Sequence, residues 1–527
     1  MADDPTFAPI PGLRHAAIRP GDAAFNATPP LTLLRQAAAR QPDAIALVGS
    51  TGRVTFAELL AGMAKVAAAV AAQVPAGRAV ACLVPQAPDG VVGLLGCLVS
   101  GRVCLMLNPA EPADRLAALL EDAAPAALLS GTPRDVPAGL PVLSLPALLA
   151  GPAAEFPAAS TPWDPDAPLS VHFTSGSTGR PKGIVLSARS TMHRAAQGIA
   201  AWQPVPGDVA LLTSPASGAN VVALILALLG NGACFLAASL AEEGAGAVLR
   251  LATREGVTLA SFPAQVMRLL GRLQATPTAI ARLRLLRMAA AGLPQTDVAL
   301  ARQVVPAGCW IEHTYASTEA QIVARWVLPH SGPDLAAAGE TMVPAGLREP
   351  GHEMALLDPD GLPVAPGEAG EVVLRGPLLA LGEWRGGQVV PAAMRPEPGR
   401  PGWRRFHTGD LARVGADGLL RILGRADRQV KINGVRVEPA EVEAVLRAEP
   451  GVTDAAILAV AGPGGTVLHG FVAAPGVAPA ALQAALRDRL AAALPMAFRP
   501  ARLTVLDRLP TLPSGKLDQV ALRALAG

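Results

Sequence analysis

Short apolar runs alternate with helical patterns along the first part of the chain, and no other feature constrains the fold as strongly. Runs that are apolar throughout and separated by helices are typical of parallel strands covered by helices on both faces. The predicted strands lie at 44–49, 80–84 and 103–107, and the predicted helices at 31–40, 56–72 and near 88–100. The sequence therefore predicts an α/β fold with a mostly parallel sheet.

The same alternation resumes with a predicted strand at 169–173 and continues to about residue 330. From 350 to 425 the pattern changes to short strands punctuated by Gly and Pro, which predicts a small antiparallel barrel or sheet. After it come two helical patterns, near 439–448 and 479–494, with two strands between them. This last stretch is predicted to form a separate small α+β domain.

The charge balance and the cysteines exclude several functions. Lys and Arg number 44 and Asp and Glu 42, and this near-equality argues against a nucleic-acid partner, which requires a concentrated basic face. The five cysteines form no C-x-x-C pair, so neither a disulfide framework nor a zinc site is predicted, and a reducing cytoplasm is the expected location. The N-terminal segment also lacks the basic and apolar order of a signal peptide.

One uncharged stretch, from Ala219 to Ala241, is long enough to span a bilayer. Gly230, Asn231 and Gly232 interrupt it in the middle, as the turn of a helix–turn–strand unit does. We therefore predict two buried elements here and no membrane span.

The densest chemical signal is Thr174-Ser-Gly-Ser-Thr-Gly-Arg-Pro-Lys182-Gly183, which follows a predicted strand. Its glycines allow backbone N–H groups to turn inward, and its hydroxyls and lysine add further donors, so the loop suits a polyphosphate. Because Lys182 is followed by Gly183 instead of Ser or Thr, the loop is not the P-loop NTPase motif. Taken alone, a flexible surface loop is an equally good interpretation.

Four further motifs follow in order along the chain. They are Tyr315-Ala-Ser-Thr-Glu319, Phe406-His-Thr-Gly-Asp410, Gly424-Arg425-Ala-Asp427-Arg-Gln-Val-Lys431-Ile-Asn-Gly434 and Leu512-Pro-Ser-Gly-Lys516-Leu-Asp518. Together with the phosphate loop they resemble the motif set of the adenylate-forming superfamily, which comprises acyl-CoA synthetases, the adenylation domains of nonribosomal peptide synthetases, and luciferases. The resemblance covers roughly residues 30–525.

The resemblance implies a fold and a reaction. The fold has a large N-terminal domain, residues 1–426, with two βαβ subdomains and a small β-barrel, hinged at Asp427 to a mobile α+β C-terminal lid, residues 427–527. The implied enzyme is an acid–thiol ligase that uses ATP and Mg²⁺. A carboxylate attacks the α-phosphate of ATP to give an acyl-adenylate and pyrophosphate. A thiol, from CoA or from the phosphopantetheine arm of a carrier protein, then displaces AMP.

The family's nucleotide-binding roles carry over to the matching residues. The phosphate loop would bind the β- and γ-phosphates, and Glu319 with Thr178 would hold Mg²⁺. Tyr315 would lie on the adenine face, while Asp410 would accept hydrogen bonds from the ribose hydroxyls. For His313 simple packing, and for Lys431 a surface strand position, are equally good interpretations. The residues expected at the nucleotide are Thr174, Ser175, Gly176, Ser177, Thr178, Gly179, Lys182, Gly292, His313, Tyr315, Asp410, Arg425 and Lys431.

Lys516 is the residue expected to carry the first half-reaction, with Glu319 and Thr318 as further catalytic residues. Two anions, a carboxylate and a triphosphate, must meet, and an ammonium that bridges them would screen their repulsion. Motion of the lid about Asp427 would deliver Lys516 and later exchange it for the strand around Gly434.

The acid substrate is harder to predict. Relatives that activate α-amino acids carry an Asp in the segment after the phosphate loop, but no acidic residue occurs here between Asp208 and Glu242. A buried ammonium without a counter-charge is costly, so neutral-tailed aryl or short aliphatic acids are expected to be preferred to α-amino acids. The expected acid pocket includes Ala219, Asn220 and Ala291. Asn220 would meet a hydroxyl of the acid or, as the slightly favoured alternative, cap the following helix.

The sequence thus predicts an ATP-dependent ligase that loads a carboxylic acid onto a carrier protein supplied in trans. The segment from Gln429 to Glu443 and the run Asn108-Pro-Ala-Glu-Pro-Ala-Asp-Arg115 look most like peptide-synthetase adenylation domains. One alternative is an acyl- or aryl-CoA synthetase that uses free CoA. A remote alternative is a catalytically silent nucleotide-binding protein on the same fold.

Overall fold

The structure is a computed structural model of the 527-residue chain. It describes residues 23–132, 139–158, 163–174, 182–272, 280–289, 292–332, 342–426, 430–432, 435–437, 439–462, 465–494, 496–512 and 517–526.

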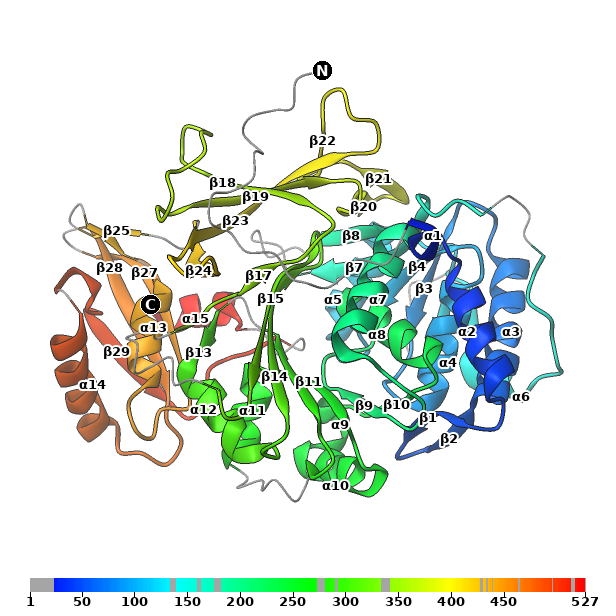
Figure 1. The fold of residues 1–527 in the computed structure, drawn as a ribbon, viewed down its shortest axis with the longest axis horizontal. Helices are drawn as coiled ribbons and strands as arrows, with labels where there is room; N and C mark the ends of the chain where they lie inside the picture. The colour runs from blue at the N-terminus through cyan, green and yellow to red at the C-terminus, as the bar shows by residue number, and fades with distance from the viewer. Residues whose placement is uncertain are drawn as a thin grey trace.

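Two large sheets form the N-terminal part of the chain (Figure 1). The eight-stranded sheet consists, in order, of β21 (Gln388–Val390), β20 (Gly382–Arg385), β8 (Lys182–Ser187), β7 (Pro168–Thr174), β4 (Val103–Leu107), β3 (Ala79–Leu83), β5 (Ala127–Ser130) and β6 (Val142–Ser144). The nine-stranded sheet consists of β17 (Leu347–Arg348), β15 (Gln321–Pro329), β14 (Trp310–Ser317), β12 (Leu285–Ala289), β11 (Leu259–Pro263), β9 (Val209–Leu212), β10 (Cys234–Leu236), β1 (Ile45–Gly49) and β2 (Gly52–Thr55). Their central strands are parallel and antiparallel strands lie at their edges, which confirms the predicted α/β class.

Helices cover these sheets, and α7 and α8 lie between the two (Figure 1). The helices of this part are α1 (Ala23–Asn26), α2 (Pro30–Arg40), α3 (Phe56–Gln73), α4 (Pro88–Leu98), α5 (Ala113–Ala123), α6 (Leu145–Ala150), α7 (Ala188–Trp202), α8 (Ala219–Gly230), α9 (Leu240–Glu243), α10 (Ala245–Glu255), α11 (Ala264–Arg272) and α12 (Gln295–Val304). The largest apolar cluster joins both helices to strands of both sheets, so α7 and α8 are core elements.

The third part is an antiparallel sheet, as the Gly- and Pro-punctuated pattern predicts. It consists of β18 (Glu353–Leu357), β19 (Gly370–Gly376), β23 (Arg404–Val414), β22 (Arg395–Pro396) and β24 (Leu420–Arg425), and a small ribbon pairs β13 (Leu293–Pro294) with β16 (Met342–Val343). The sheet packs its apolar face against Tyr315 and Ala219 of the N-terminal part. It therefore connects the functional motifs around residues 315 and 410.

The C-terminal elements form a small α+β unit on the left of Figure 1. They are β25 (Val430–Ile432), β26 (Val435–Val437), α13 (Pro439–Arg447), β27 (Asp454–Gly462), β28 (Gly465–Ala473), α14 (Pro479–Ala493), a 3-10 turn (Met496–Phe498), β29 (Arg502–Leu506) and α15 (Gln519–Ala526). Leu482, Leu486 and Leu490 of α14 are buried against this sheet, as their helical spacing predicts. β29 and α15 had no separate signal in the sequence pattern. Asp427, the predicted hinge, lies outside the described residues, so the domain boundary stays a prediction.

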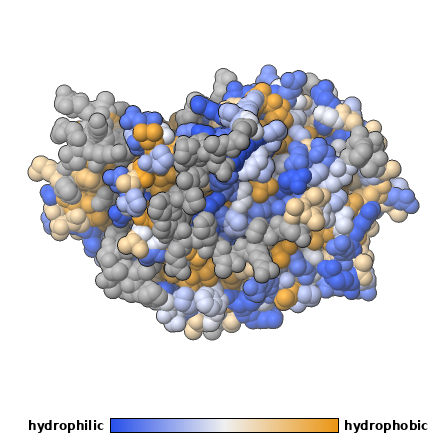
Figure 2. Space-filling view, turned by 45° about the horizontal axis from the view of Figure 1, so that its top comes forward, coloured by the Kyte–Doolittle hydropathy of each residue, from blue (hydrophilic) through white to orange (hydrophobic). Residues whose placement is uncertain are grey.

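The stretch from Ala219 to Ala241 forms α8, a turn and β10, which confirms the predicted helix–turn–strand unit. A different helix, α3, is long and apolar enough to cross a membrane by length and composition. Eight of its residues are buried, and a capping box of Thr55 and Glu58 begins it, as in a helix that packs within a folded core. On the face shown in Figure 2, hydrophobic residues lie in small groups among hydrophilic ones.

Candidate active site

A cleft of about 880 Å³ lies where the eight-stranded sheet, the antiparallel sheet and the C-terminal unit meet. It brings together residues of all five sequence motifs, namely Thr174, Lys182, Ser317, Glu319, Phe406, His407, Thr408, Asp410, Arg425, Leu512, Leu517 and Asp518. Segments hundreds of residues apart in sequence thus share one polar cavity.

The phosphate loop joins two neighbouring strands. Thr174, at the end of β7, is paired with Lys182, at the start of β8, so the loop between them is the turn of an antiparallel hairpin. Lys182 is about one-third exposed, and its Nζ lies 3.9 Å from Oε1 of Glu383. Ser175, Gly176, Ser177, Thr178 and Gly179 lie outside the described residues, and what is described is the pair of strands that carries them.

Tyr315, Asp410 and Arg425 form a contiguous group. The Tyr315 hydroxyl donates to Oδ2 of Asp410 at 2.5 Å, and Arg425 Nη1 lies 3.6 Å from Oδ1. Burial and the nearby Asp410 carboxylate raise the pKa of Tyr315 well above its usual value, so the phenol stays a donor. Gly409 has φ of 72°, and a Cβ there would lie 2.8 Å from Arg425 Nη2, which explains the glycine of this motif.

Glu319 borders the same cleft at the turn after β14. Within the described part of the chain its carboxylate makes no hydrogen bond or ion pair, while its carbonyl accepts from the Ala380 amide at 2.8 Å. The backbone is therefore held, and the carboxylate stays available. Such an oxygen donor, in the same cleft as the ends of β7 and β8, fits a hard cation such as Mg²⁺. Thr318 is partly exposed beside it.

His313 and Gly292 both lie close to the segment that contains Met342 and Pro344. His313 is 1% exposed, and its Nδ1 donates to the Pro344 carbonyl at 3.0 Å. A Cβ at Gly292 would lie 2.7 Å from the Met342 side chain, so the backbone there tolerates no larger residue without adjustment. The two contact partners, Pro344 and Met342, belong to the segment that begins at residue 342, after residues 333–341, which lie outside the described part of the chain.

Four further predicted residues lie wholly or partly outside the described part of the chain. Asp427, Ala291 and Lys516 lie outside the described residues, and for Lys431 the backbone in β25 is described but not the side chain. Leu512 and Leu517, on either side of the Lys516 loop, both border the cleft. The C-terminal unit is held to α11 by an ion pair of 2.9 Å between Arg268 and Asp454.

The expectation that Asn220 caps its helix is wrong. The helix begins at Ala219, so its N-cap is Gly218, which has no side chain to cap it. Asn220 lies within the first turn, and its Oδ1 accepts from Nε of Arg194 at 3.0 Å. The loop before α8 is fixed by His172, whose Nδ1 donates to the Ser217 carbonyl at 2.7 Å.

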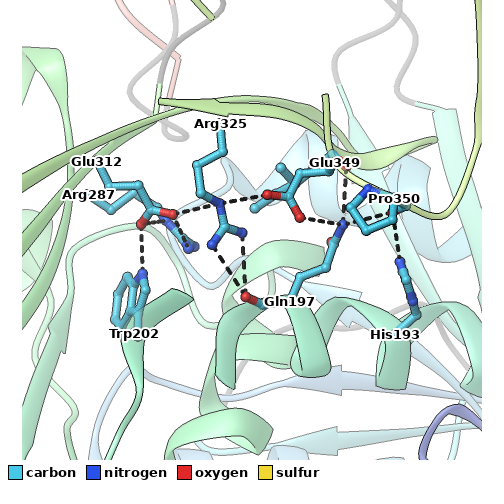
Figure 3. Close-up of polar contacts among 9 residues, drawn as sticks. His193, Gln197, Trp202, Arg287, Glu312, Arg325, Glu349 and Pro350 are labelled. Atoms are coloured by element: carbon cyan, nitrogen blue, oxygen red, sulfur yellow. Dashed lines mark hydrogen bonds and ion pairs between the residues drawn. The ribbon is translucent and has the colours of Figure 1, made fainter. Parts of the chain in front are cut away.

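Between α7 and strands β12, β14 and β15 of the nine-stranded sheet lies a cluster of four buried charges, Arg287, Glu312, Arg325 and Glu349, which we call the buried network (Figure 3). Nε of Arg287 donates to Glu312 at 2.8 Å, and Nε of Arg325 lies 3.0 Å from Glu312 and 3.1 Å from Glu349. Trp202 donates a further hydrogen bond to Glu312 at 2.7 Å. Burial opposes ionisation of Glu312, but the two guanidiniums outweigh it and lower the pKa to about 2.

Sequence reasoning missed several charged residues of the cleft. Arg115 ends the run Asn108–Arg115, which was used only as a sign of the family. Glu383 could have been found only by knowing that β20 pairs with β8. Arg523 comes from α15 of the C-terminal unit, outside every quoted motif. Cations and carboxylates are thus mixed in the cleft, as a nucleotide with a metal ion requires.

Comparison with known proteins places the chain in a family. Residues 34–384 match the model of the AMP-binding enzyme family, and residues 441–516 match the AMP-binding enzyme C-terminal domain. The chain belongs to the AMP-binding enzyme family. As an adenylate-forming enzyme it has the fold class that its motifs predict.

Three similar proteins illustrate the range of the family. This AMP-binding enzyme is 34% identical to the isonitrile lipopeptide synthase of Streptomyces coeruleorubidus over 94% of the chain, but it spans only 33% of that protein. It is 32% identical to novobiocin biosynthesis protein H of Streptomyces niveus, with 85% of the chain and 74% of that protein covered. An o-succinylbenzoate CoA synthetase from Bacillus subtilis, solved with its acyl-adenylate, has the same fold at a TM-score of 0.76 and 24% identity, with 93% and 97% covered.

Proposed function

We propose that this adenylate-forming enzyme activates a carboxylic acid other than an α-amino acid and transfers the acyl group to the phosphopantetheine thiol of a carrier protein. In the first step a carboxylate oxygen attacks the α-phosphorus of ATP, and pyrophosphate leaves. In the second step the thiol sulfur attacks the acyl carbon, and AMP leaves. The cleft that joins Thr174, Glu319 and Asp410 with both flanks of the Lys516 loop is the observation that carries the proposal.

The proposed roles follow from the contacts. Asp410 keeps one oxygen on the Tyr315 hydroxyl, and its carboxylate would also accept from a ribose hydroxyl, with Arg425 beside it. The Tyr315 ring would lie against adenine. Thr174 and Lys182 hold the two ends of the hairpin that would bind the leaving pyrophosphate.

Two further residues would act at the reacting atoms. Glu319, whose carboxylate has no partner among the described residues, would hold Mg²⁺ together with Thr178, and the ion would neutralise phosphate charge. Lys516 would bridge the acid carboxylate and the α-phosphate and so lower their repulsion during attack. Because both flanks of its loop border the cleft, the described arrangement suits the first half-reaction.

The carrier protein as acceptor is supported by the curated relatives. The chain spans about a third of the first of them, and others include subunits of plipastatin synthase and a dimodular nonribosomal peptide synthase of Bacillus subtilis. The alternative acceptor is free CoA, and the fold is shared with CoA ligases. A silent nucleotide-binding protein is disfavoured because Glu319, Asp410 and Arg425 are all present in one cleft.

Acid-dependent exchange of labelled pyrophosphate into ATP tests the proposal. Exchange with at least one neutral-tailed aryl or short aliphatic acid, and none with the twenty α-amino acids, is the expected result. Transfer of the labelled acyl group to a holo-carrier protein, measured beside transfer to CoA, then decides the acceptor. Exchange with α-amino acids alone would overturn the substrate class and leave the ligase chemistry intact.

A further inference from the structure

Glu383 is a carboxylate of the cleft that the proposed reaction does not use. It belongs to β20, which pairs antiparallel with β8, and it lies opposite Ile184. Lys182 is two residues before Ile184 on β8, so the two side chains lie on the same face of the sheet. Lys182, Ile184 and Glu383 all border the cleft, and Glu383 is 4% exposed. The strand pairing thus places a buried carboxylate beside the lysine that begins β8.

The two oxygens of Glu383 have different partners. Oε2 accepts hydrogen bonds from Nε and Nη2 of Arg385, at 3.2 and 2.5 Å. Oε1 lies 3.9 Å from Nζ of Lys182, which is within the range of an ion pair but too long for a hydrogen bond. Arg385 therefore fixes the carboxylate, and the oxygen nearer to Lys182 keeps its capacity to accept a hydrogen bond.

Lys182 is the movable partner of this pair. Its side chain is 38% exposed, and its ammonium makes no hydrogen bond within the described part of the chain. A lysine side chain is a flexible stem with three rotatable donors, and an ion pair this exposed contributes little free energy. An anion in the cleft can therefore draw the ammonium away from Glu383 at small cost.

The position of the pair relates it to the leaving group of the proposed reaction. Lys182 is paired with Thr174 across the hairpin that would bind pyrophosphate. Pyrophosphate carries several negative charges, so cations without other partners would hold it tightly and slow its departure. A carboxylate fixed beside Lys182 competes with pyrophosphate for the same ammonium.

We propose that Glu383 is a positioning residue that acts through Lys182 and limits the affinity of the enzyme for pyrophosphate. The inference rests on the proposed function and describes the release of its leaving group. Before ATP binds, Lys182 rests against Glu383 at the base of the hairpin. The triphosphate draws the ammonium into the cleft. After the acyl-adenylate has formed, Glu383 takes the ammonium back as pyrophosphate leaves.

Binding of inorganic pyrophosphate, measured by calorimetry with Mg²⁺ and without acid or ATP, tests the proposal. Glu383→Gln keeps the shape of the side chain and an acceptor for Arg385 but removes the charge, so Kd is expected to fall about tenfold. Lys182→Met is expected to raise Kd by about tenfold or more. In the Lys182→Met background, Glu383→Gln is expected to change Kd by less than about twofold, because its effect passes through the ammonium.

Glu353→Gln is the matched control. Glu353 also lies on a strand and is paired with an arginine, Arg375, at 2.6 Å, but it is not among the described residues that border the cleft. The substitution removes the same charge and is expected to leave Kd unchanged. Glu383→Asp withdraws the carboxylate from Lys182 by one methylene and is expected to lower Kd by a smaller factor. It replaces Glu383→Gln in the test if thermal unfolding shows that the latter does not fold.

Inhibition by pyrophosphate separates this role from a merely structural one. During acyl transfer to the thiol, Glu383→Gln is expected to lower the inhibition constant of pyrophosphate about tenfold and to leave KM for the acid within about twofold. Equal changes in both constants, or an unchanged Kd for pyrophosphate, would overturn the proposal. Tenfold tighter binding that persists in the Lys182→Met background would also overturn it, because the carboxylate would then repel pyrophosphate directly.

The binding measurements distinguish failure of this inference from failure of the proposed function. If the natural chain and Glu383→Gln bind pyrophosphate equally, the inference alone is rejected. If the natural chain does not bind pyrophosphate, the phosphate site of the proposed function is rejected with it. Tighter binding by Glu383→Gln, without exchange by any acid, would support the role of Glu383 and reject the ligase chemistry.

Discussion

The nucleotide end of the cleft and the buried network are built in opposite ways. At the nucleotide end the charged groups are open and loosely paired: Lys182 and Arg425 are 38% and 44% exposed, and their carboxylate partners lie at 3.9 and 3.6 Å. In the buried network, Arg287 and Glu312 are 2% and 0% exposed and 2.8 Å apart. The charges of the network are thus paired within the protein, whereas those of the cleft are left open to a ligand that would bring its own charge.

This difference predicts different consequences of substitution. Exposed pairs contribute little to folding because water and salt screen them. Buried pairs are strongly coupled, and removal of one partner leaves an uncompensated charge. Substitutions at the nucleotide end should therefore change catalysis and binding, while those in the buried network should change stability first.

The largest effect is expected from Lys516→Ala. Loss of a charge that bridges two anions should lower acid-dependent pyrophosphate exchange by about 10³- to 10⁵-fold. Transfer of the acyl group from a preformed adenylate to the thiol should be nearly unchanged, because only the first step joins two anions. Lys65→Ala is the control, since Lys65 bonds to the Leu149 carbonyl away from the cleft. Equal loss of both half-reactions would contradict the proposed role.

Glu312→Gln should give the largest loss of stability. Arg287 and Arg325 would lose their shared counter-ion, and the free energy of unfolding should fall by about 3–5 kcal/mol. Denaturant unfolding measures this, and Asp417→Asn, in an exposed pair with Arg421, should cost less than about 1 kcal/mol. If the two variants lost similar free energies of unfolding, the contrast between the buried network and the exposed pairs would be contradicted.

The contribution of Glu312 to the free energy of unfolding depends on pH. The folded pKa of Glu312 is about 2, below the ordinary value of 4.5. The unfolded chain therefore binds this proton first as the pH falls, and the stability from Glu312 is complete above about pH 5 and is lost toward pH 2.

Asp410→Asn should act on the nucleotide and spare the acid. Loss of charge-assisted hydrogen bonds worth about 1.5–3 kcal/mol should weaken ATP binding by about 10- to 150-fold, measured by calorimetry. Tyr315→Phe removes the hydroxyl that donates to Asp410 but keeps the carboxylate, so it should cost less. Unchanged ATP affinity together with an altered order of preferred acids would show that the nucleotide lies elsewhere.

The smallest effect concerns His172 behind the α8 loop. Burial lowers its pKa to about 4 from 6.5, so the unfolded chain binds this proton first as the pH falls below 6.5. Stability is complete above that value and is lost toward pH 4, by on the order of 2 kcal/mol between pH 7.5 and 5. His172→Gln should flatten this part of the pH profile of unfolding. If His172→Gln left the slope unchanged, the pH dependence would come from other groups, such as His193 and His352.

Much of the fold could be predicted because its signals are local. The strand at 103–107 and the helix from Phe56 follow from their own apolar patterns, and the glycine-rich loop follows from its composition. Asn220 was misread because a capping residue and a first-turn residue look alike until the start of the helix is known.

The buried network had no comparable signal in the sequence. Arg287, Glu312 and Arg325 are single charges on three different strands, and only the pairing of β12 with β14 and of β14 with β15 brings them together. Glu383 became a cleft residue through the pairing of β20 with β8, about 200 residues apart. Sequence motifs therefore revealed the cleft, and tertiary structure was needed for the buried network.

The most direct test of the account is pyrophosphate exchange with a panel of twenty α-amino acids and neutral-tailed acids. The account predicts exchange with neutral-tailed acids outside the α-amino class, and its loss in Lys516→Ala. Robust exchange confined to α-amino acids would contradict the proposed substrate class, and the absence of exchange with any acid would contradict the ligase function itself.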